Sequence, residues 1–313
     1  MSYLTEHWSF SPFLIIAIVV AVWHEIGLAR LARRSPADQN SQRRRRSLLF
    51  YAGLAVLLIA VQSPIDYWSY GYLFVHMIQH LLLMFAAPTL IVAGAPWQPL
   101  RVALPGWSGS AATREVLTSW ARPLRAVGGF MLRPWVSVIT FSLVMIFWHL
   151  PGPFDLADRN LAVHTWVMES TFLVAGVLFW LQFIGSPPFR IKMSAIGQAT
   201  ALLATNIVMW VLAMAMGFLS SSSWYSVYNH VPGVTLPAFA DQQIGAGILW
   251  ICGDFWAIPT MIFVIRKLLA EDGSIGAAVD RILGRGSARY NWANRGRVLP
   301  FASDPDEHES LTQ

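Results

Sequence analysis

The chain has 313 residues, of which 55% are hydrophobic and only 12% are charged, and its formal net charge is +5. Soluble proteins carry about 25% charged residues, so this composition indicates an integral membrane protein. The positive charge does not indicate nucleic-acid binding, because the basic residues are spread over separate loops. A single cysteine, Cys252, excludes an internal disulfide and the cysteine-pair motifs of many metal carriers.

Seven apolar segments predict transmembrane helices, since a span needs about 20 mostly apolar residues. The predicted spans are residues 13–29, 48–63, 73–93, 134–150, 162–184, 197–219 and 244–265. These runs are too long for membrane strands and do not alternate. The expected fold is therefore an all-α, seven-helix membrane bundle over residues 1–270, followed by a polar tail over residues 271–313.

The basic residues predict how the bundle is oriented. Every Lys and Arg except Arg159 lies after the first, third, fifth or seventh span. Because cytoplasmic loops are enriched in Lys and Arg, the N-terminus is expected outside the cell and the C-terminus in the cytoplasm. The run Arg43 to Arg46 is expected to anchor this topology, with contact to membrane lipids as an alternative role.

Four histidines fall at the outer ends of three successive spans in this orientation. His76 and His80 are one helical turn apart, so their imidazoles share a face and can chelate a metal ion. His149 lies at the end of the fourth span and His164 at the start of the fifth. The sequence therefore predicts an external metal site of these four residues. The alternative is histidines that meet lipid head groups.

Thioethers and one carboxylate extend this pattern. Methionines lie four residues from three of the histidines: Met84, Met145 and Met168. Imidazole with thioether suits Cu(I), so these residues are predicted as additional ligands or as side chains that contact the ligands, with apolar packing as the alternative. Asp241, at the outer start of the seventh span, is the one carboxylate expected to join, as a ligand or as a partner that orients a histidine. No cluster of carboxylates is expected there.

Two other acidic residues, Glu169 and Asp254, lie within predicted spans. Ionisable side chains at this depth mark functional sites or hydrogen bonds between helices, for example to Asn206, and both interpretations stay open. Pro88 removes the hydrogen bond to the carbonyl of Met84. The third span is therefore expected to kink just below the histidine pair.

The sequence also resembles the multi-span CtaG-type cytochrome c oxidase assembly factors, first associated with Gram-positive bacteria. The matching stretches are His76 to Met84 with Ala87-Pro88 and Gly94-Ala-Pro96, Trp148-His149-Leu-Pro151, the run from His164 to Trp180, and Asp241 to Gly245 with Trp250. Together they extend the resemblance over roughly residues 10 to 270. The resemblance implies a role in building the copper centre of a haem–copper oxidase, whose catalytic subunit would be the partner.

The resemblance implies that the four histidines correspond to the family's own histidines. Many members carry a further histidine about one turn after the one in the fifth span. Here that neighbourhood reads Val167-Met168-Glu169-Ser170. Either Met168 or Glu169 substitutes for that histidine, or the site has one ligand fewer.

The combined expectation is a bacterial plasma-membrane protein that holds Cu(I) at its outer face and hands it to the oxidase without catalysing a reaction. An external copper carrier protein is a second expected partner. Three alternatives stay open. A haem-binding electron carrier would use His80 and His164, although His76 and His80 on one helix cannot sandwich the same haem. A transporter would need a polar pathway through Glu169 and Asp254, and a metal-free scaffold would only bind oxidase subunits.

Overall fold

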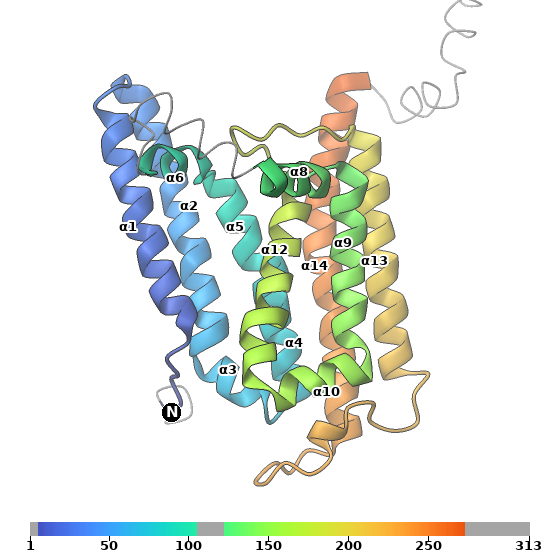
Figure 1. Cartoon of the computed structure of the whole chain (residues 1–313). Helices are drawn as coiled ribbons and strands as arrows, with labels where there is room; N and C mark the ends of the chain where they lie inside the picture. Colours follow the sequence, from blue (N-terminus) through green and yellow to red (C-terminus); the bar gives the residue numbers. More distant parts are fainter. Residues whose placement is uncertain (1–5, 105–121, 273–313) are drawn as a thin grey trace, which may run out of the picture. The chain divides into compact units, whose positions relative to one another are not determined.

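The computed structural model describes residues 6–104 and 122–272, and these are mostly helical, with no strand among them (Figure 1). In chain order the elements are α1 (Pro12–Ala32), α2 (Ala37–Gln62), α3 (Pro64–Ser69), α4 (Leu73–Leu81), the π-helix η2 (Leu82–Ala86), α5 (Ala87–Gly94), α6 (Trp97–Ala103), α8 (Arg122–Met131), α9 (Pro134–His149), α10 (Pro151–Arg159), α11 (Leu161–Val163), the π-helix η3 (His164–Glu169), α12 (Ser170–Trp180), α13 (Ala195–Gly217), the 3₁₀ turn η4 (Ser226–Tyr228) and α14 (Ala238–Asp272). Two compact units are present, Met1–Met261 and Ile262–Gln313. In the described part, the second unit consists of the last turns of α14, and the first holds all other elements. The predicted tail at 271–313 lies almost wholly outside the described residues.

Six segments are long and apolar enough to cross a membrane. They are α1, α2, the run Leu73–Gly94 through α4, η2 and α5, the run Leu161–Trp180 through α11, η3 and α12, α13, and α14 over Ala238–Lys267. A seventh span requires α9, which has 16 residues and meets α8 at a bend of 83°. At its length of about 24 Å, α9 crosses most of a bilayer core about 30 Å thick. The all-α membrane bundle is therefore confirmed, with six to seven spans.

The second span differs most from its predicted bounds. The sequence predicts residues 48–63, whereas α2 runs from Ala37 to Gln62 and includes Arg43 to Arg46. Hydropathy detects only the apolar part of a helix. Arginine is a good helix former, so the helix continues beyond the apolar part. The arginine run is consequently part of a helix and not of a loop.

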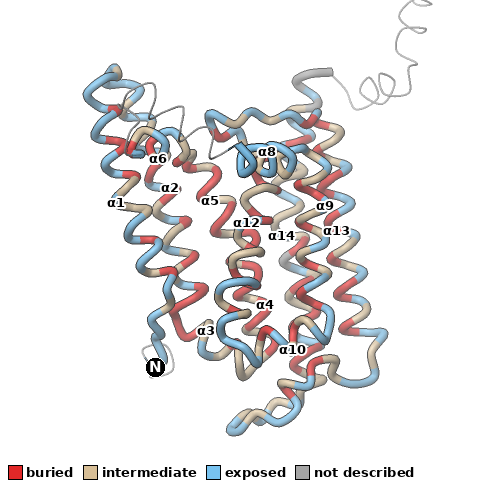
Figure 2. The backbone as a smooth tube through the Cα atoms, in the orientation of Figure 1, coloured by how far each residue is buried: buried red, intermediate tan, exposed pale blue. Residues whose placement is uncertain are grey.

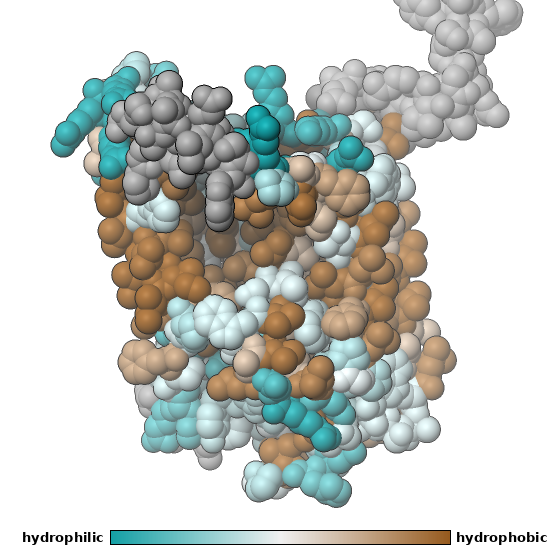
Figure 3. Space-filling model, in the orientation of Figure 1, coloured by the Kyte–Doolittle hydropathy of each residue, from teal (hydrophilic) through white to brown (hydrophobic). Residues whose placement is uncertain are grey.

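Short helices lie at both ends of the first unit. In Figure 1, α3 and α10 lie near the first described residues, and α6 and α8 lie at the opposite end. Hydrogen bonds join the basic segments at the α6 end: Arg30 Nη1 donates to Val102 O at 2.9 Å, and Trp97 Nε1 donates to Ser186 Oγ at 2.6 Å. The visible surface is mostly hydrophobic between these ends and more hydrophilic at both (Figure 3). The basic segments of this unit thus share one end, and its orientation in the membrane stays a prediction.

Cysteine labelling tests the predicted orientation. In a Cys252→Ser background, His230→Cys is expected to react with a membrane-impermeant maleimide in intact cells, because His230 lies on the predicted outer side. Arg34→Cys is expected to react only after the cells are broken. Both positions are solvent-exposed, so accessibility depends on the side of the membrane. The reverse pattern of labelling would show that the N-terminus is cytoplasmic.

The helix that carries His76 and His80 is the most buried span. In the apolar stretch of Leu73–Gly94, 67% of the residues are buried, against 39% or less in the apolar stretches of the other five spans. The first helix, α1, is largely exposed (Figure 2). Two glycines allow neighbours to approach it closely. A Cβ on Gly176 of α12 would lie 2.5 Å from the Met84 carbonyl oxygen, and one on Gly53 of α2 would lie 2.7 Å from Ile91 Cγ1. Small residues at such contacts are typical of membrane helices.

Two interruptions of α-helical geometry lie beside the predicted site. The π-helix η2 ends two residues before Pro88, close to the position where the sequence predicts a kink. The second π-helix, η3, begins at His164 and ends at Glu169. Single-turn π-helices occur frequently at functional sites. Here each one adjoins a predicted metal ligand, since η2 follows His80 by two residues and η3 includes His164.

Candidate metal centre

Asp241 fixes the start of the helix that carries the histidine pair. α4 has no capping side chain of its own at Tyr72. Instead, Asp241 Oδ2 accepts a hydrogen bond from Leu73 N at 2.7 Å, and its Oδ1 accepts one from Phe74 N at 2.9 Å. A carboxylate at a helix N-terminus also stabilises the helix dipole. The sequence predicts Asp241 as a ligand or as a partner of a histidine, but both of its oxygens bind backbone amides.

Replacing Asp241 with alanine should therefore destabilise the fold. The change leaves the buried amide of Leu73 and the partly buried amide of Phe74 without acceptors, for which we expect a loss of about 2–3 kcal/mol in unfolding free energy. Thermal unfolding of the purified protein in detergent measures the effect. Asp38→Ala is the control, because Asp38 is exposed in the first turn of α2. Equal melting temperatures for the Asp241 variant and the wild type would contradict the capping role.

The four predicted histidines lie together. His76 and His80 come from α4, His149 from the end of α9 and His164 from the start of η3. The ring centroids are 4.5 Å apart for His76 and His80, 5.1 Å for His76 and His164, and 5.5 Å for His80 and His149. No ring is more than 5% exposed. Side chains that met lipid head groups would be exposed, so that alternative does not describe this cluster.

Hydrogen bonds set the tautomer of two of these rings. His149 Nδ1 lies 2.7 Å from the Met145 carbonyl oxygen, which can only accept, so the hydrogen of the neutral ring is on Nδ1. The Tyr228 hydroxyl donates its one hydrogen to Ser69 O at 2.7 Å and therefore accepts from His76 Nδ1 at 2.8 Å. In both rings the lone pair is left on Nε2. Partners of this kind commonly orient metal-binding histidines.

Six ring nitrogens of the cluster are buried and have no hydrogen-bond partner within the described part of the chain. They are His76 Nε2, His80 Nδ1 and Nε2, His149 Nε2, and His164 Nδ1 and Nε2. An unsatisfied buried polar group costs about 1–3 kcal/mol. A protein interior with this many unpaired ring nitrogens is therefore energetically unfavourable, and a bound cation would offset the cost.

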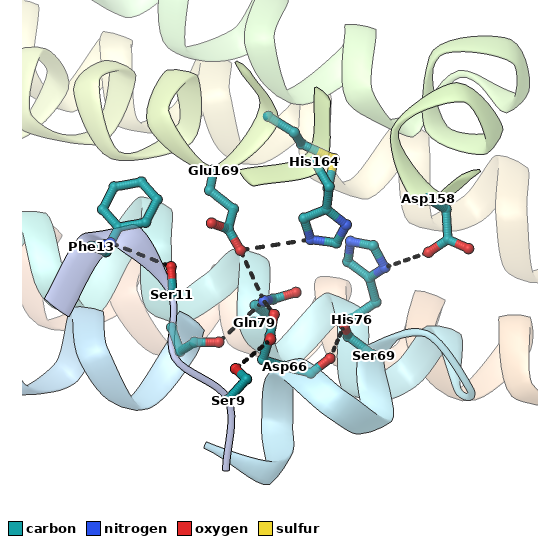
Figure 4. Close-up of polar contacts among 12 residues, drawn as sticks. Ser9, Ser11, Phe13, Asp66, Ser69, His76, Gln79, Asp158, His164 and Glu169 are labelled. Atoms are coloured by element: carbon teal, nitrogen blue, oxygen red, sulfur yellow. Dashed lines mark hydrogen bonds and ion pairs between the residues drawn. The ribbon is translucent and has the colours of Figure 1, made fainter. Parts of the chain in front are cut away.

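The π-helix brings Glu169 close to His164. In a π-helix the backbone bond runs from residue i to residue i+5, and Glu169 is five residues after His164. Glu169 is 2% exposed, and its Oε1 lies 3.7 Å from His164 Nε2 (Figure 4). The resemblance leaves open whether Met168 or Glu169 takes the place of a further histidine or the site has one ligand fewer, and in an α-helix Met168 would be the residue one turn after His164. The altered geometry makes Glu169 a neighbour of the cluster.

The sequence misses two other carboxylates near the cluster. Asp66 of α3 accepts hydrogen bonds from Ser9 Oγ at 3.1 Å and Gln79 Nε2 at 3.0 Å, and burial raises its pKa to about 6. Asp158 of α10 has its Oδ1 3.9 Å from His76 Nδ1. Burial, together with the charge of Asp155, raises the pKa of Asp158 to about 7. The sequence-based expectation names Asp241 and Glu169 among the carboxylates at the site, and it does not include Asp66 or Asp158.

A signal for Asp66 is present in the sequence. Ser63-Pro64 directly after the second span is a typical helix start, with Ser as the N-cap and Pro at the first helical position. The Ser63 hydroxyl does accept a hydrogen bond from Ile65 N at 3.2 Å. Such a start predicts a short helix at the outer end of the span, which places Asp66 on the same side as the histidines.

The three methionines are buried, with 2% exposure for Met84 and Met145 and 1% for Met168. Met145 contributes its backbone carbonyl to the orientation of His149. Ligation by the thioethers stays a prediction. The remaining acidic candidate from the sequence, Asp254, accepts hydrogen bonds from Asn206 Nδ2 at 2.9 Å and Trp210 Nε1 at 3.2 Å. These contacts support its interpretation as a polar link between α13 and α14.

A cavity of about 470 Å³ lies next to the cluster. It is lined by Tyr67 and Trp68 of α3, by Tyr70 and Gly71 of the α3–α4 connection, and by Val231, Pro232, Gly233 and Val234. The Tyr70 ring also lies 5.0 Å from the His164 ring. The cavity is therefore separated from a histidine of the cluster by a single side chain.

The model of the family described as cytochrome c oxidase caa3 assembly factor (Caa3_CtaG) matches residues 22–271, a range that contains all four histidines. The chain belongs to this family. As a Caa3_CtaG protein with several apolar helices, it is a multi-pass protein of the plasma membrane. The family description identifies its members as assembly factors for cytochrome c oxidase.

Several mycobacterial proteins are similar to this Caa3_CtaG protein. Uncharacterized proteins of Mycobacterium bovis and Mycobacterium tuberculosis are each 27% identical to it over 278 residues. An uncharacterized protein of Mycobacterium leprae is 24% identical over 283 residues. Each alignment covers 88% of this chain and 41% of the relative, so the chain spans about two fifths of these relatives' length. No solved structure matches the chain significantly.

Proposed function

We propose that this protein binds Cu(I) through His76, His80, His149 and His164 at the outer membrane face and delivers it to the copper centre of a cytochrome c oxidase. The observation that carries the proposal is the group of six buried, unpartnered ring nitrogens in four adjacent rings. Copper is a suitable ion for such imidazole ligands, and nearby thioethers favour its reduced state. The proposed acceptor is a cytochrome c oxidase because the family is described as an assembly factor for this enzyme.

The position of the cluster suits release of the ion. Its ligands come from α4, α9 and η3, so small movements between these elements would open the site. The cavity beside Tyr70 offers a route by which the ion could pass between the cluster and a donor or acceptor protein at the surface. An oxidase catalytic subunit and an external copper carrier are the partners that this role requires, and it requires no catalysed reaction.

Ring packing argues against the haem alternative. A haem held by two histidines lies between their rings, on opposite faces of the macrocycle. In the cluster, neighbouring rings already lie 4.5–5.5 Å apart, and His80 also contacts the Phe172 ring at 4.3 Å. A macrocycle would have to push these side chains apart.

The metal-free scaffold alternative differs from our proposal in what it predicts for the copper content of the oxidase.

The copper content of the oxidase itself tests the proposed function. Oxidase purified from a bacterium that lacks this gene is expected to contain haem but to be deficient in copper. A copy with His149→Ala and His164→Ala should not restore the copper, whereas a copy with His230→Ala should, because His230 is exposed outside the cluster. Full copper content without the gene contradicts delivery. Restoration by the double variant indicates a scaffold that needs no metal.

A further inference from the structure

We infer that Asp66, Glu169 and His164 form a second cation position, which takes a divalent transition-metal ion and shares His164 with the four-histidine cluster. The carboxylate position, as we call this group, deepens the proposed function and rests on it for the role of the neighbouring cluster.

The three side chains converge on one point from two elements. One oxygen each of Asp66 and Glu169 and one ring nitrogen of His164 all lie within 4.8 Å of one another. Figure 4 shows Asp66 approaching from α3, and Glu169 and His164 from η3. Glu169 and His164 are 98% or more buried. Glu169 Oε2 and both nitrogens of His164 have no hydrogen-bond partner within the described residues.

Gln79 lies between the two carboxylates but cannot satisfy both fully. Its Nε2 lies within hydrogen-bond distance of three acceptors: Ala60 O at 3.1 Å, Asp66 Oδ1 at 3.0 Å and Glu169 Oε1 at 3.3 Å. A side-chain amide has only two hydrogens to donate. At least one of these oxygens therefore lacks a hydrogen from Gln79. A cation between the carboxylates would satisfy their oxygens and balance their charge.

The donor set identifies the class of ion. Two carboxylate oxygens with one imidazole are harder ligands than the all-imidazole cluster and softer than the oxygen sites of Mg²⁺ or Ca²⁺. Such a set suits divalent ions such as Zn²⁺, Mn²⁺ or Cu²⁺. The cluster next to it suits Cu(I). The two positions should therefore differ in the ions that they prefer.

His164 is the link between the two positions. Its Nε2 faces Glu169 Oε1 at 3.7 Å, while its ring stacks with the His76 ring at 5.1 Å. Because His164 belongs to both positions, an ion at one position would compete for this ligand with an ion at the other. Asp66 is only partly buried, in a short helix beside the first described residues. The carboxylate position is therefore closer to solvent than the four-histidine cluster is. The inference involves no change in oxidation state.

Metal titrations of the purified full chain test this inference. Zn²⁺ binding is measured by calorimetry, and Cu(I) binding by competition with a coloured chelator under anaerobic conditions. In Asp66→Asn/Glu169→Gln we expect Zn²⁺ affinity to fall by about 100-fold or more and Cu(I) affinity to change by less than about threefold. In His80→Ala/His149→Ala we expect the opposite. Asp38→Asn is the control, since Asp38 is an exposed carboxylate in the first turn of α2 and outside both positions, and it should leave both affinities unchanged.

The outcomes of these titrations test the carboxylate position and the proposed Cu(I) cluster separately. Unchanged Zn²⁺ affinity in Asp66→Asn/Glu169→Gln overturns the carboxylate position, as does a joint loss of both metals in the two double variants, which would indicate one site. If the wild type binds Zn²⁺ but no Cu(I), the proposed function fails and the second position stands. Thermal unfolding verifies that each variant is folded. If the double carboxylate variant is not folded, Asp66→Asn alone must lower Zn²⁺ affinity, or the inference is wrong.

Discussion

The double variant His76→Ala/His80→Ala is expected to purify without copper, whereas the wild type retains it. Both residues are buried ligands in the proposed cluster, and the loss of either leaves too few imidazoles around the ion. Even partners outside the ligand shell change metal affinity by about 10–100-fold. The loss of two ligands should therefore exceed about 100-fold. Elemental analysis of protein purified under anaerobic, reducing conditions measures the effect.

The control for this experiment is His230→Ala. It removes a histidine from the same predicted side of the membrane, but one that is exposed and outside the cluster. It should leave the copper content unchanged. If the His76/His80 variant retained as much copper as the wild type, the cluster could not be the binding site, and the copper would have to be bound elsewhere.

Tyr228→Phe is expected to weaken Cu(I) binding by about 10–100-fold although Tyr228 is not a ligand. Its hydroxyl accepts from His76 Nδ1 at 2.8 Å and so keeps the lone pair on Nε2, the nitrogen that is available to the ion. Without this contact, His76 is free to rotate or to change tautomer. Competition with a Cu(I) chelator measures the change in affinity.

Tyr225→Phe separates this effect from a general loss of packing. Tyr225 is also buried and contacts Phe154, but its hydroxyl donates to the backbone oxygen of His149 at 2.9 Å and not to an imidazole ring. We expect a similar loss of stability in the two variants but a much smaller loss of affinity in Tyr225→Phe. Equal losses of affinity would show that Tyr228 does not act through His76.

The sequence predicts the bundle and the grouping of the four histidines because both depend on simple rules. Apolar length defines the spans, and alternating span directions bring the end of one helix beside the start of the next. His149 and His164 therefore had to lie at the end that also carries His76 and His80. The structure places all four within contact of their neighbours.

The features that the sequence does not predict depend on contacts between distant segments. Asp241 lies more than 150 residues after the helix start that it caps, and no local pattern relates the two. The π-helix at His164 replaces the i+4 neighbour Met168 with the i+5 neighbour Glu169, a change that hydrophobic periodicity cannot show. Tyr228 reaches His76 from a loop between two spans. Such loops contain few periodic signals.

We propose that this Caa3_CtaG protein carries copper at its histidine cluster. The most direct test is metal analysis of the purified wild-type protein, with the visible spectrum recorded on the same sample. We predict copper in stoichiometric amount and no Soret band. Absence of copper after anaerobic loading with Cu(I), or a Soret band with haem in place of copper, would contradict the account.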